Sequence, residues 1–469
     1  MTTTSDARTL TRSAARTSGR WIEDWRPEDP AFWSASGAPT ARRNLIFSIF
    51  SEHVGFSIWS LWSVFVLFLT PAYGLSHDAK TAAAQKFLLT TLPTAIGALA
   101  RLPYTFAVAR FGGRNWTVVS AALLLIPTVV ASIVLEPGVS YGTLLVVAAL
   151  AGVGGGNFAS SMANINAFYP QRLKGRALGL NAGGGNLGVP AVQLVALLVL
   201  ALAGKSHPRM LLAIYIPLVV VAALAAALTM DNLRQARNEK RAMRQAAKEP
   251  DTWVISLLYI GTFGSFIGFG FAFGQVLQNQ FGSHFLTGGK VDPVKIAYIT
   301  FLGPLVGSLI RPLGGALADR LGGARTTLWN FGAMVAAASV VFVASREQSL
   351  VLFYVGFIGL FVFSGIGNGS TYKMIPAIFH SRALSRIAEG ADPAAAEQES
   401  RRLAGATIGI AGAVGAFGGV LVNIAFRQSF LAYRSGDGAY VAFIAFYVLC
   451  AIVTWAVYAR PARVARHQV

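Results

Sequence analysis

The chain has 469 residues, of which 54% are hydrophobic and only 13% are charged, and its mean hydropathy is +0.55. Soluble globular proteins carry about 25% charged residues, so this composition excludes a protein that is surrounded by water alone. The single cysteine, Cys450, excludes a disulfide framework and a cysteine-rich metal site. The net charge of +19 lies in short blocks between apolar runs, which indicates membrane topology rather than nucleic-acid binding.

A helix that spans a membrane needs about 20 mostly apolar residues. Twelve runs of this kind occur along the chain, at roughly residues 44–70, 86–111, 116–135, 141–168, 175–203, 209–230, 253–280, 294–319, 326–345, 350–379, 403–426 and 438–459. The first run is too long for the apolar region of a signal peptide, so we expect it to remain as a spanning helix. The sequence therefore predicts an all-α polytopic membrane protein with 12 transmembrane helices.

Lysine and arginine concentrate in the cytoplasmic loops of membrane proteins. With the N-terminus placed inside, 27 basic residues fall in inner segments and 9 in outer loops, so we expect both termini in the cytoplasm. A long basic inner connection, residues 231–252, divides the twelve runs into six and six. The expected parts are a cytoplasmic N-terminal tail (1–43), an N-terminal half (44–230), a basic linker (231–252), a C-terminal half (253–459) and a cytoplasmic C-terminal tail (460–469).

The two halves share a sequence pattern at an offset of 210 residues. The matching positions are Arg101/Arg311, Arg110/Arg320, Gly112/Gly322 and Gly113/Gly323. Two six-helix halves joined by a basic loop describe the major facilitator architecture, in which the substrate binds between the halves near the bilayer midplane. Residues 315–323 also resemble the inner-loop motif of that superfamily, whereas Ala109 stands where the first-half copy would have an acid.

Of the 39 basic residues, the other three lie inside apolar runs and away from their ends, namely Arg101, Arg311 and Lys373. The two arginines lie deep in equivalent helices without matching carboxylates, and an arginine at a helix centre costs about 2.5–3.5 kcal/mol on insertion scales. Such a pair is expected when the missing counter-ion is an anionic substrate, because guanidinium presents a planar fork of donors to oxygen anions. The alternative is that each arginine reaches the inner interface or caps carbonyls. Lys373 lies nearer the cytoplasmic end, and the sequence assigns it no role.

Four of the runs, 141–168, 175–203, 350–379 and 403–426, are rich in glycine, and in the first three asparagines lie within or beside the glycine-rich stretches. Glycine allows close helix packing, and the candidates for flexible positions are Gly154, Gly156, Gly183, Gly185, Gly365, Gly367, Gly412 and Gly415. Asparagines are costly against lipid, so they should face the interior and either pair between helices or donate to an anion: Asn157, Asn164, Asn166, Asn181, Asn186 and Asn368. Because phosphate-loop, nucleophile-elbow and zinc-protease motifs are missing, we expect no enzyme activity, no cofactor and no metal site.

Several long motifs, in the same order, resemble those of the nitrate/nitrite porter family of the major facilitator superfamily. Residues 152–170 and 363–374 are similar to its two signature motifs, and residues 253–269 and 446–458 are similar to its seventh and last helices. The resemblance covers about residues 41–460. It implies a carrier of the bacterial cytoplasmic (inner) membrane that serves nitrate assimilation, works as a monomer in the lipid bilayer and binds no nucleic acid.

The resemblance also implies roles for individual residues. The two substrate-binding arginines of the family match Arg101 and Arg311, which would hold nitrate or nitrite between the halves. Aromatic and polar residues beside the anion match four further positions, Tyr259, Phe263, Asn164 and Asn166. The glycine-rich helices would bend as access alternates, and nitrate import would be exchanged for nitrite export.

Glu52 and His53, adjacent in the first helix, depart from the family pattern, since strict exchangers need no titratable residue in the pathway. By the offset of 210 residues, His53 lies opposite Phe263, near the cavity. A histidine changes charge near neutral pH, so one interpretation is proton-coupled nitrate symport through Glu52 or His53. The other is a satisfied structural pair or a contact to a neighbouring helix. A carrier for another small anion is a further alternative, whereas an organic-solute facilitator would need more polar groups and a sensor would need longer tails.

Overall fold

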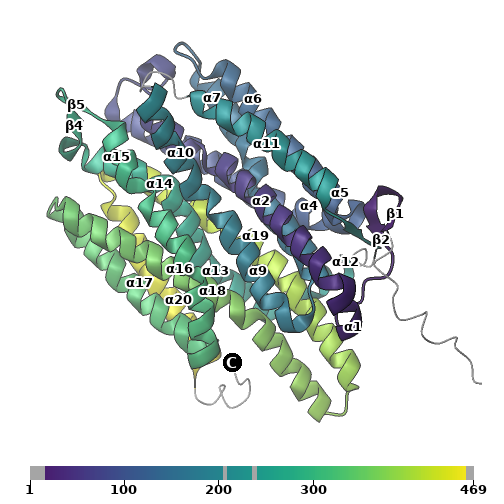
Figure 1. Ribbon diagram of the computed structural model, residues 1–469. Helices are drawn as coiled ribbons and strands as arrows, with labels where there is room; N and C mark the ends of the chain where they lie inside the picture. The colour runs from purple at the N-terminus through teal and green to yellow at the C-terminus, as the bar shows by residue number, and fades with distance from the viewer. Residues whose placement is uncertain (1–15, 204–208, 235–239, 461–469) are drawn as a thin grey trace, which may run out of the picture.

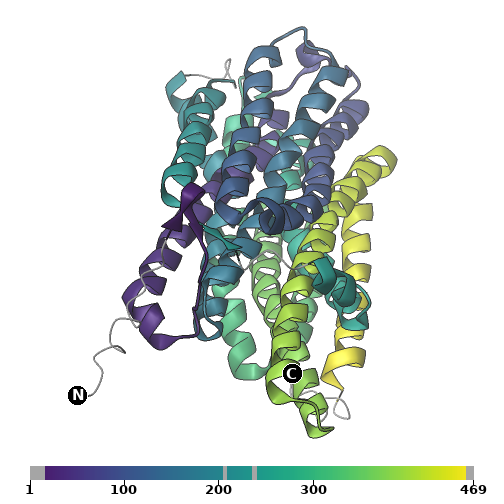
Figure 2. The same ribbon diagram turned by 90° about the vertical axis from the view of Figure 1, so that its right-hand side faces the viewer.

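The computed structural model describes residues 16–203, 209–234 and 240–460. Part of the predicted N-terminal tail, Lys205, residues 235–239 of the basic linker and the predicted C-terminal tail after Arg460 lie outside the described residues. The described chain is almost entirely helical, and its long helices run side by side in one bundle (Figure 1, Figure 2).

In the first part of the chain, most long helices are broken by one residue or a short turn. In chain order the segments are α1 (Pro30–Phe32) and a π turn (Trp33–Gly37) that lead into α2 (Ala38–Ser60) and α3 (Trp62–Phe68); a 3-10 turn (Pro71–Tyr73); α4 (Ala79–Phe111); α5 (Gly113–Leu123) with α6 (Leu125–Val134); α7 (Tyr141–Ala151), a 3-10 segment (Gly152–Gly156) and α8 (Asn157–Phe168); α9 (Gln171–Asn186) with α10 (Gly188–Ala203); and α11 (Met210–Thr229).

The second part has fewer interruptions and contains the two longest helices. Its segments are α12 (Lys240–Ala246); α13 (Pro250–Tyr259), a π turn (Ile260–Gly264) and α14 (Ser265–Gln280); a 3-10 turn (Gly282–His284); α15 (Pro293–Thr300) with α16 (Leu302–Leu321); α17 (Gly323–Arg346); α18 (Leu350–Ala388); α19 (Pro393–Tyr433); and α20 (Asp437–Thr454) with a final π turn (Trp455–Ala459).

Each of the twelve predicted apolar runs falls on one of these helical segments, so the predicted all-α membrane fold is confirmed. Among the described residues, eleven segments are long and apolar enough to span a membrane. The remaining predicted span, α4, has 33 residues, but its apolar run is diluted by Arg101, by threonines and by two prolines.

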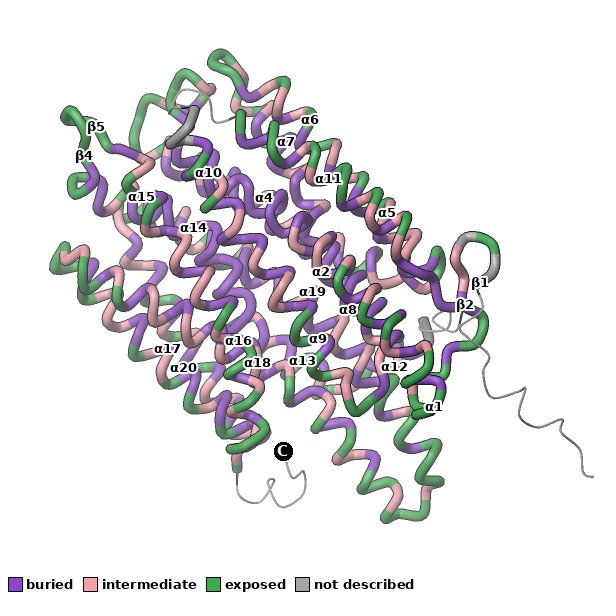
Figure 3. The backbone as a smooth tube through the Cα atoms, viewed as in Figure 1, coloured by how far each residue is buried: buried purple, intermediate pink, exposed green. Residues whose placement is uncertain are grey.

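The outer surface of the bundle is apolar, and the polar interior residues lie on the central helices. Buried residues gather along α2, α4 and α14, whereas the outer helices expose one face (Figure 3). Large apolar side chains stay exposed there, for example Trp329 (78%), Val351 (76%) and Leu228 (71%). A surface of this kind requires lipid, because soluble proteins rarely expose large contiguous apolar patches.

Short strands mark the two ends of the bundle. One end carries a three-stranded sheet of β1 (Arg16–Thr17), β2 (Trp21–Ile22) and β3 (Asn232–Leu233), in which a 3-10 turn (Ser18–Arg20) joins the antiparallel β1 and β2 and β3 pairs in parallel with β2. Helix α12 lies at the same end, which we name the linker end (Figure 1). The opposite end of the bundle carries the antiparallel pair β4 (Leu286–Thr287) and β5 (Lys290–Val291), and we name it the hairpin end.

Helices α4 and α16, which carry the two predicted arginines, end in the same way. Helix α4 begins after Asp78, whose carboxylate accepts hydrogen bonds from the Thr81 amide and hydroxyl, and these bonds lower the pKa of Asp78. It ends at Gly112, which has φ 89°, and α16 ends at Gly322, which also has φ 89°. This left-handed conformation favours glycine. The two glycines are 210 residues apart, so positions related by this offset have the same backbone conformation at the ends of α4 and α16.

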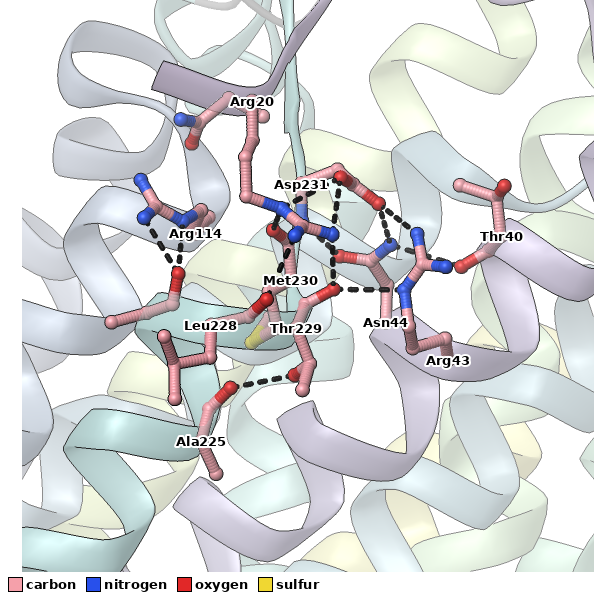
Figure 4. A network of polar contacts seen from close by, with 12 residues as sticks. Arg20, Thr40, Arg43, Asn44, Arg114, Ala225, Leu228, Thr229, Met230 and Asp231 are labelled. Carbon is pink, nitrogen blue, oxygen red and sulfur yellow. Dashed lines mark hydrogen bonds and ion pairs between the residues drawn. The ribbon is translucent and has the colours of Figure 1, made fainter. Parts of the chain in front are cut away.

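Arginine side chains cap the end of α11 (Figure 4). The last carbonyl groups of a helix have no partner inside the helix. Here Arg114 donates to Ala227 O, and Arg20 donates to the carbonyls of residues 228–230 at 2.7–2.9 Å. The fully buried Asp231 pairs with Arg20 and Arg43 and accepts from Asn44 at 3.2 Å. The segment predicted as an N-terminal tail thus includes ordered residues that contact α2 and α11.

Helices from the two parts of the chain pack along one central seam. Helix α4 packs against α19 and α14, α3 packs against α14, and α9 and α10 pack against α16. Helices α5, α6, α7 and α11 lie on one side of this seam, and α16, α17, α18 and α20 lie on the other (Figure 1). Residues that face the seam can therefore meet partners from the opposite side.

Candidate functional site

Arg101 lies on α4, fully buried at the seam, and reaches across it. Its Nε donates to Gly155 O at 3.2 Å, and its Nη1 donates to Gly412 O of α19 at 2.7 Å. The guanidinium carbon lies over the rings of Phe158 at 4.7 Å and Trp59 at 5.6 Å. Carbonyl dipoles and aromatic faces stabilise the cation without neutralising it, so its full charge remains.

Arg311 approaches from α16, on the other side of the seam, and is 6% exposed. Its Nη2 donates to the hydroxyl of Tyr259 at 3.0 Å, and its guanidinium carbon lies 5.8 Å from the ring of Tyr372. The hydroxyl proton of Tyr259 stays available for a second partner, because the oxygen is the acceptor in this bond.

The ring of Phe263 lies near both arginines. The Arg101 carbon is 4.8 Å and the Arg311 carbon 6.0 Å from its ring centroid, and Tyr259 stacks on it at 5.1 Å. Among the described residues, Arg101 Nη2 and Arg311 Nη1 have no hydrogen-bond partner. A buried charged donor without a partner is costly, so both nitrogens are suited to bind an oxygen anion between them.

Glu52 is the carboxyl group of this site. It is fully buried and interacts electrostatically with both Arg101 and Arg311, although it forms no ion pair with either. Its Oε2 accepts from the hydroxyl of Ser161 and from Asn181 Nδ2 at 2.7 Å, while Oε1 has no partner among the described residues. The expectation that the arginines lack a matching carboxylate is therefore only partly right.

His53 and Lys373 lie away from the two guanidinium groups. The Nδ1–H of His53 donates to Gly184 O at 3.1 Å, so His53 faces α9 and does not pair with Glu52. Lys373 is half exposed and pairs with Asp319 on α16 at 2.8 Å. The sequence assigned Lys373 no role, and the structure gives it a partner on a neighbouring helix.

The two predicted asparagines are placed differently. Asn166 lines a cavity of about 30 Å³ that also touches Phe158, Tyr372 and Gly412, which is room for about two water molecules. Asn164 packs against Gly113 at the turn between α4 and α5, and no described hydrogen bond joins it to either arginine. The cavity extends from Phe158 and Tyr372, which contact the arginines, toward the linker end, where Met243 of α12 lines it.

Most of the predicted flexible glycines are positions of close packing. An added Cβ would lie within 3.0 Å of a neighbouring atom at Gly154, Gly156, Gly185, Gly365, Gly367 and Gly415. Gly412 has ordinary contacts, and a Cβ at Gly183 would meet nothing within 4 Å. At Gly185 the obstructing atom is Glu52 Oε1, and at Gly415 it belongs to Tyr259, so two of these glycines shape the site directly.

Several site residues escaped the sequence reasoning. They are Phe158, Trp59 and Tyr372 as rings against the guanidinium groups, Ser161 as a partner of Glu52, and the carbonyls of Gly155 and Gly412. Asn181 was expected to face the interior, and its partner there is Glu52. The positions of Phe158, directly after the glycine–asparagine run, and of Tyr372, beside Lys373, were the available signals.

Comparisons with known proteins identify the family of the chain. The Major Facilitator Superfamily model matches residues 45–422. The nitrate/nitrite transporter NarU of Escherichia coli (strain K12) is 38% identical over 94% of this chain and 96% of that protein. The probable nitrate/nitrite antiporter NarK2 of Thermus thermophilus is 33% identical over 94% of this chain and 97% of that protein.

Among solved structures, the xylose transporter XylE from E. coli, in a partially occluded inward-open conformation, matches with a TM-score of 0.65. The match has 11% sequence identity and covers 90% of this chain and 98% of that chain, so it shows a shared fold alone. The family resemblance inferred from the sequence motifs is confirmed by the two relatives. The chain belongs to the major facilitator superfamily and, within it, to the nitrate/nitrite porter family.

Proposed function

We propose that this protein carries nitrate and nitrite across the bacterial cytoplasmic membrane by alternating access, with nitrate import exchanged for nitrite export. One observation carries the proposal. Arg101 and Arg311 approach one another from opposite sides of the seam and share the ring of Phe263, and each keeps a buried nitrogen that has no partner in the described part of the chain. A planar oxygen anion fits two guanidinium donors. The names of the relatives, nitrate/nitrite transporter and nitrate/nitrite antiporter, support the same substrate.

Repulsion between the arginines supports coupling of transport to an anion. Both guanidinium carbons lie near one ring centroid, at 4.8 and 6.0 Å, so they are at most about 11 Å apart. At that separation and an effective dielectric near 20, two like charges repel by roughly 1.5 kcal/mol or more. A bound anion removes this repulsion and lets the halves close, whereas closure of the empty site is opposed. Exchange follows from that barrier.

For the topology, we infer that the linker end faces the cytoplasm, with both termini on that side, because basic residues concentrate in its connections. Residues 44–230 and 253–459 would then rock as two units around the arginines, with 231–252 as the connection. The cavity of about 30 Å³ lies between residues that contact the arginines and α12 at the linker end, and its small size supports a conformation that is nearly closed on the cytoplasmic side. One chain holds the whole site, which supports a monomer.

The test is transport by purified protein in liposomes. Arg101→Ala and Arg311→Ala should each reduce nitrate uptake to the background of empty liposomes, while both variants still insert and purify as wild type does. Arg209→Ala is the matched control, since Arg209 is exposed at the hairpin end and pairs with Glu136, and it should transport normally. Nitrate uptake retained by either site variant would refute the proposed binding site.

A second candidate, proton-coupled nitrate symport, is favoured by the position of Glu52. An ionised Glu52 would balance part of the arginine charge and permit the empty carrier to return, whereas an anion between the arginines would favour a proton on Glu52. By reciprocity, a proton on Glu52 strengthens anion binding. Nitrate uptake into vesicles should be measured with and without internal nitrite at several pH values. Uptake that requires internal nitrite supports exchange, and uptake driven by external acid alone supports symport.

A further inference from the structure

Lys86 lies on α4 at the hairpin end of the seam, where the proposed exchange cycle gives it no role. It is partly buried, and its Nζ donates to Gln278 Oε1 of α14 at 3.1 Å. Among the described residues it has no other hydrogen bond and no ion pair. An ammonium group has three donors, so at least two of them lack a protein partner in this position.

Lys86 and Arg101 are fifteen residues apart on one helix, which is just over four turns or about 22 Å. Both side chains reach across the same seam, since Lys86 bonds to α14 and Arg101 bonds to Gly412 of α19. Two positive charges therefore stand along one line between the hairpin end and the central site. An anion that arrives from the hairpin end meets Lys86 first.

A layer of neutral polar side chains separates the two cations. One turn deeper than Lys86, Thr90 donates to Asn423 Oδ1 at 2.9 Å and accepts from Gln275 Nε2 at 3.1 Å. Gln278 also donates to Leu67 O at 2.9 Å, which ties α14 to the end of α3. All these contacts cross the seam, so they must break when the hairpin end opens, and Lys86 then loses its one partner.

We propose that Lys86 forms a second, outer anion-binding position, which binds nitrate or nitrite when the hairpin end opens. From this position the anion moves on to Arg101 at the central site. This inference rests on the proposed transport function. While the hairpin end is closed, the ammonium group of Lys86 donates a hydrogen bond to Gln278 Oε1. When the hairpin end opens, the anion replaces Gln278 as the hydrogen-bond acceptor. A lysine suits a transient position, because its ammonium is a compact, strongly hydrated point charge rather than a rigid fork.

The test is the KM for nitrate measured separately from each side, with vesicles that expose the hairpin end or the linker end. Lys86→Gln should raise the hairpin-side KM about fivefold or more, as expected for one lost charge-assisted hydrogen bond. The linker-side KM and the maximal rate should stay within about twofold of wild type, because the central site is intact. Lys86→Arg should restore the hairpin-side KM.

Lys290→Gln is the matched control, because Lys290 is exposed at the same end and its loss removes the same charge. It should leave both KM values unchanged. An unchanged hairpin-side KM in Lys86→Gln, an equal rise on both sides, or an equal rise in Lys290→Gln would overturn the inference. A wild-type protein that does not transport nitrate would instead refute the proposed function, so the two failures are distinct.

Gln278→Leu provides an independent measurement if Lys86→Gln does not insert. It removes the partner that Lys86 must leave before it binds an anion, so the hairpin-side KM should fall. If Lys86 only seals the closed hairpin end, Gln278→Leu will speed transport without lowering that KM. Any hairpin-side KM that does not fall in Gln278→Leu contradicts an outer anion position.

Discussion

The guanidinium groups of Arg101 and Arg311 are oriented by neutral partners. Arg101 is fixed by two carbonyl oxygens, and Arg311 is fixed by the hydroxyl of Tyr259 at 3.0 Å. Neutral partners hold a side chain in place but leave its charge for the proposed anionic substrate. Two ion pairs in the same positions would neutralise the site and remove the proposed preference for anions.

Tyr259→Phe tests this orientation. The substitution keeps the ring stacked on Phe263 but removes the oxygen that fixes Arg311 and the proton that it can offer to an anion. A hydrogen bond to a charged group contributes about 1.5 kcal/mol or more, so the KM for nitrate should rise about tenfold. Tyr354→Phe is the control, because its hydroxyl bonds to Ile299 O away from the arginines. An unchanged KM in Tyr259→Phe would show that Arg311 does not need this partner.

Glu52→Gln separates the two coupling modes. Glutamine has nearly the shape of a protonated glutamic acid but cannot release a proton. If Glu52 carries the coupled proton, the variant should lose nitrate accumulation driven by external acid and keep nitrate/nitrite counterflow. The pH profile of uptake, measured from about pH 5 to 8, should become flat. His53→Gln is the control, since His53 faces Gly184, and acid-driven accumulation that persists in Glu52→Gln would exclude Glu52 as the proton carrier.

Counting charges along the sequence was enough to find the two arginines, because a cation in an apolar run is energetically costly and therefore indicates a functional role. The same count could not place Glu52 relative to them. Whether a side chain on α2 faces α4, α8 or α9 depends on how three helices pack, and that information is not in the hydropathy of any one of them. The role of Lys373 stayed open for the same reason, since its partner Asp319 is on another helix.

At the scale of helices, Gly183 and Gly185 form a natural pair for mutation. Both are on α9, but a Cβ at Gly185 would lie 2.1 Å from Glu52 Oε1 and 2.6 Å from Glu52 Cγ, whereas Gly183 faces open space. Gly185→Ala must displace Glu52 from Ser161 and Asn181, so nitrate uptake should fall more than about tenfold. Gly183→Ala should keep uptake, since alanine is the better helix former. Equal uptake by the two variants would contradict close packing at Gly185.

The capped end of α11 should matter for stability rather than for transport. Arg20→Ala leaves the carbonyls of residues 228–230 and Asp231 with fewer partners (Figure 4), at a cost of about 2 kcal/mol. The melting temperature in detergent should fall by a few degrees, while the KM for nitrate stays constant. Arg26→Ala removes exposed ion pairs with Asp24 and Asp29 and a contact with the ring of Phe32 at 5.5 Å, but no bond to the end of α11. Its melting temperature should therefore stay closer to that of wild type than the melting temperature of Arg20→Ala does. A wild-type melting temperature for Arg20→Ala would show that the cap is dispensable.

Apolar runs predicted the long helices well, because each span must satisfy its own backbone in lipid. Their interruptions were not predictable in this way. The 3-10 segment Gly152–Gly156 and the π turn Ile260–Gly264 pack against neighbours, and they place Gly155 O and Phe263 at the site. The sheet of β1, β2 and β3 has two residues per strand, which is too short for any periodicity.

At the scale of the whole molecule, the two ends of the seam differ. Hydrogen bonds cross it at the hairpin end, between Thr90 and Asn423 and between Lys86 and Gln278, whereas the cavity extends toward the linker end. The described conformation is therefore closed at one end by polar contacts. Each contact that only this conformation makes stabilises it over the state in which the hairpin end is open.

Thr90→Val should shift this balance. Valine fills the same space but forms neither the bond to Asn423 nor the one from Gln275, so the closed hairpin end should lose about 1 kcal/mol, which changes the ratio of the two states about fivefold. Spin labels at the exposed positions His77 and Lys290, in a Cys450→Ser background, allow the distance across the hairpin end to be measured. The variant should show a larger population at long distance than wild type.

Ser132→Ala is the control for this measurement, because the Ser132 hydroxyl is exposed and bonds only to Val129 O of its own helix. Its distance distribution should match that of wild type. Nitrate should reduce the difference between Thr90→Val and wild type, since an anion between Arg101 and Arg311 helps both halves to close around it. If Thr90→Val has the wild-type distribution without nitrate, the polar layer does not hold the hairpin end closed, and the seam must be closed by apolar packing such as the contact of Trp59 with Phe271.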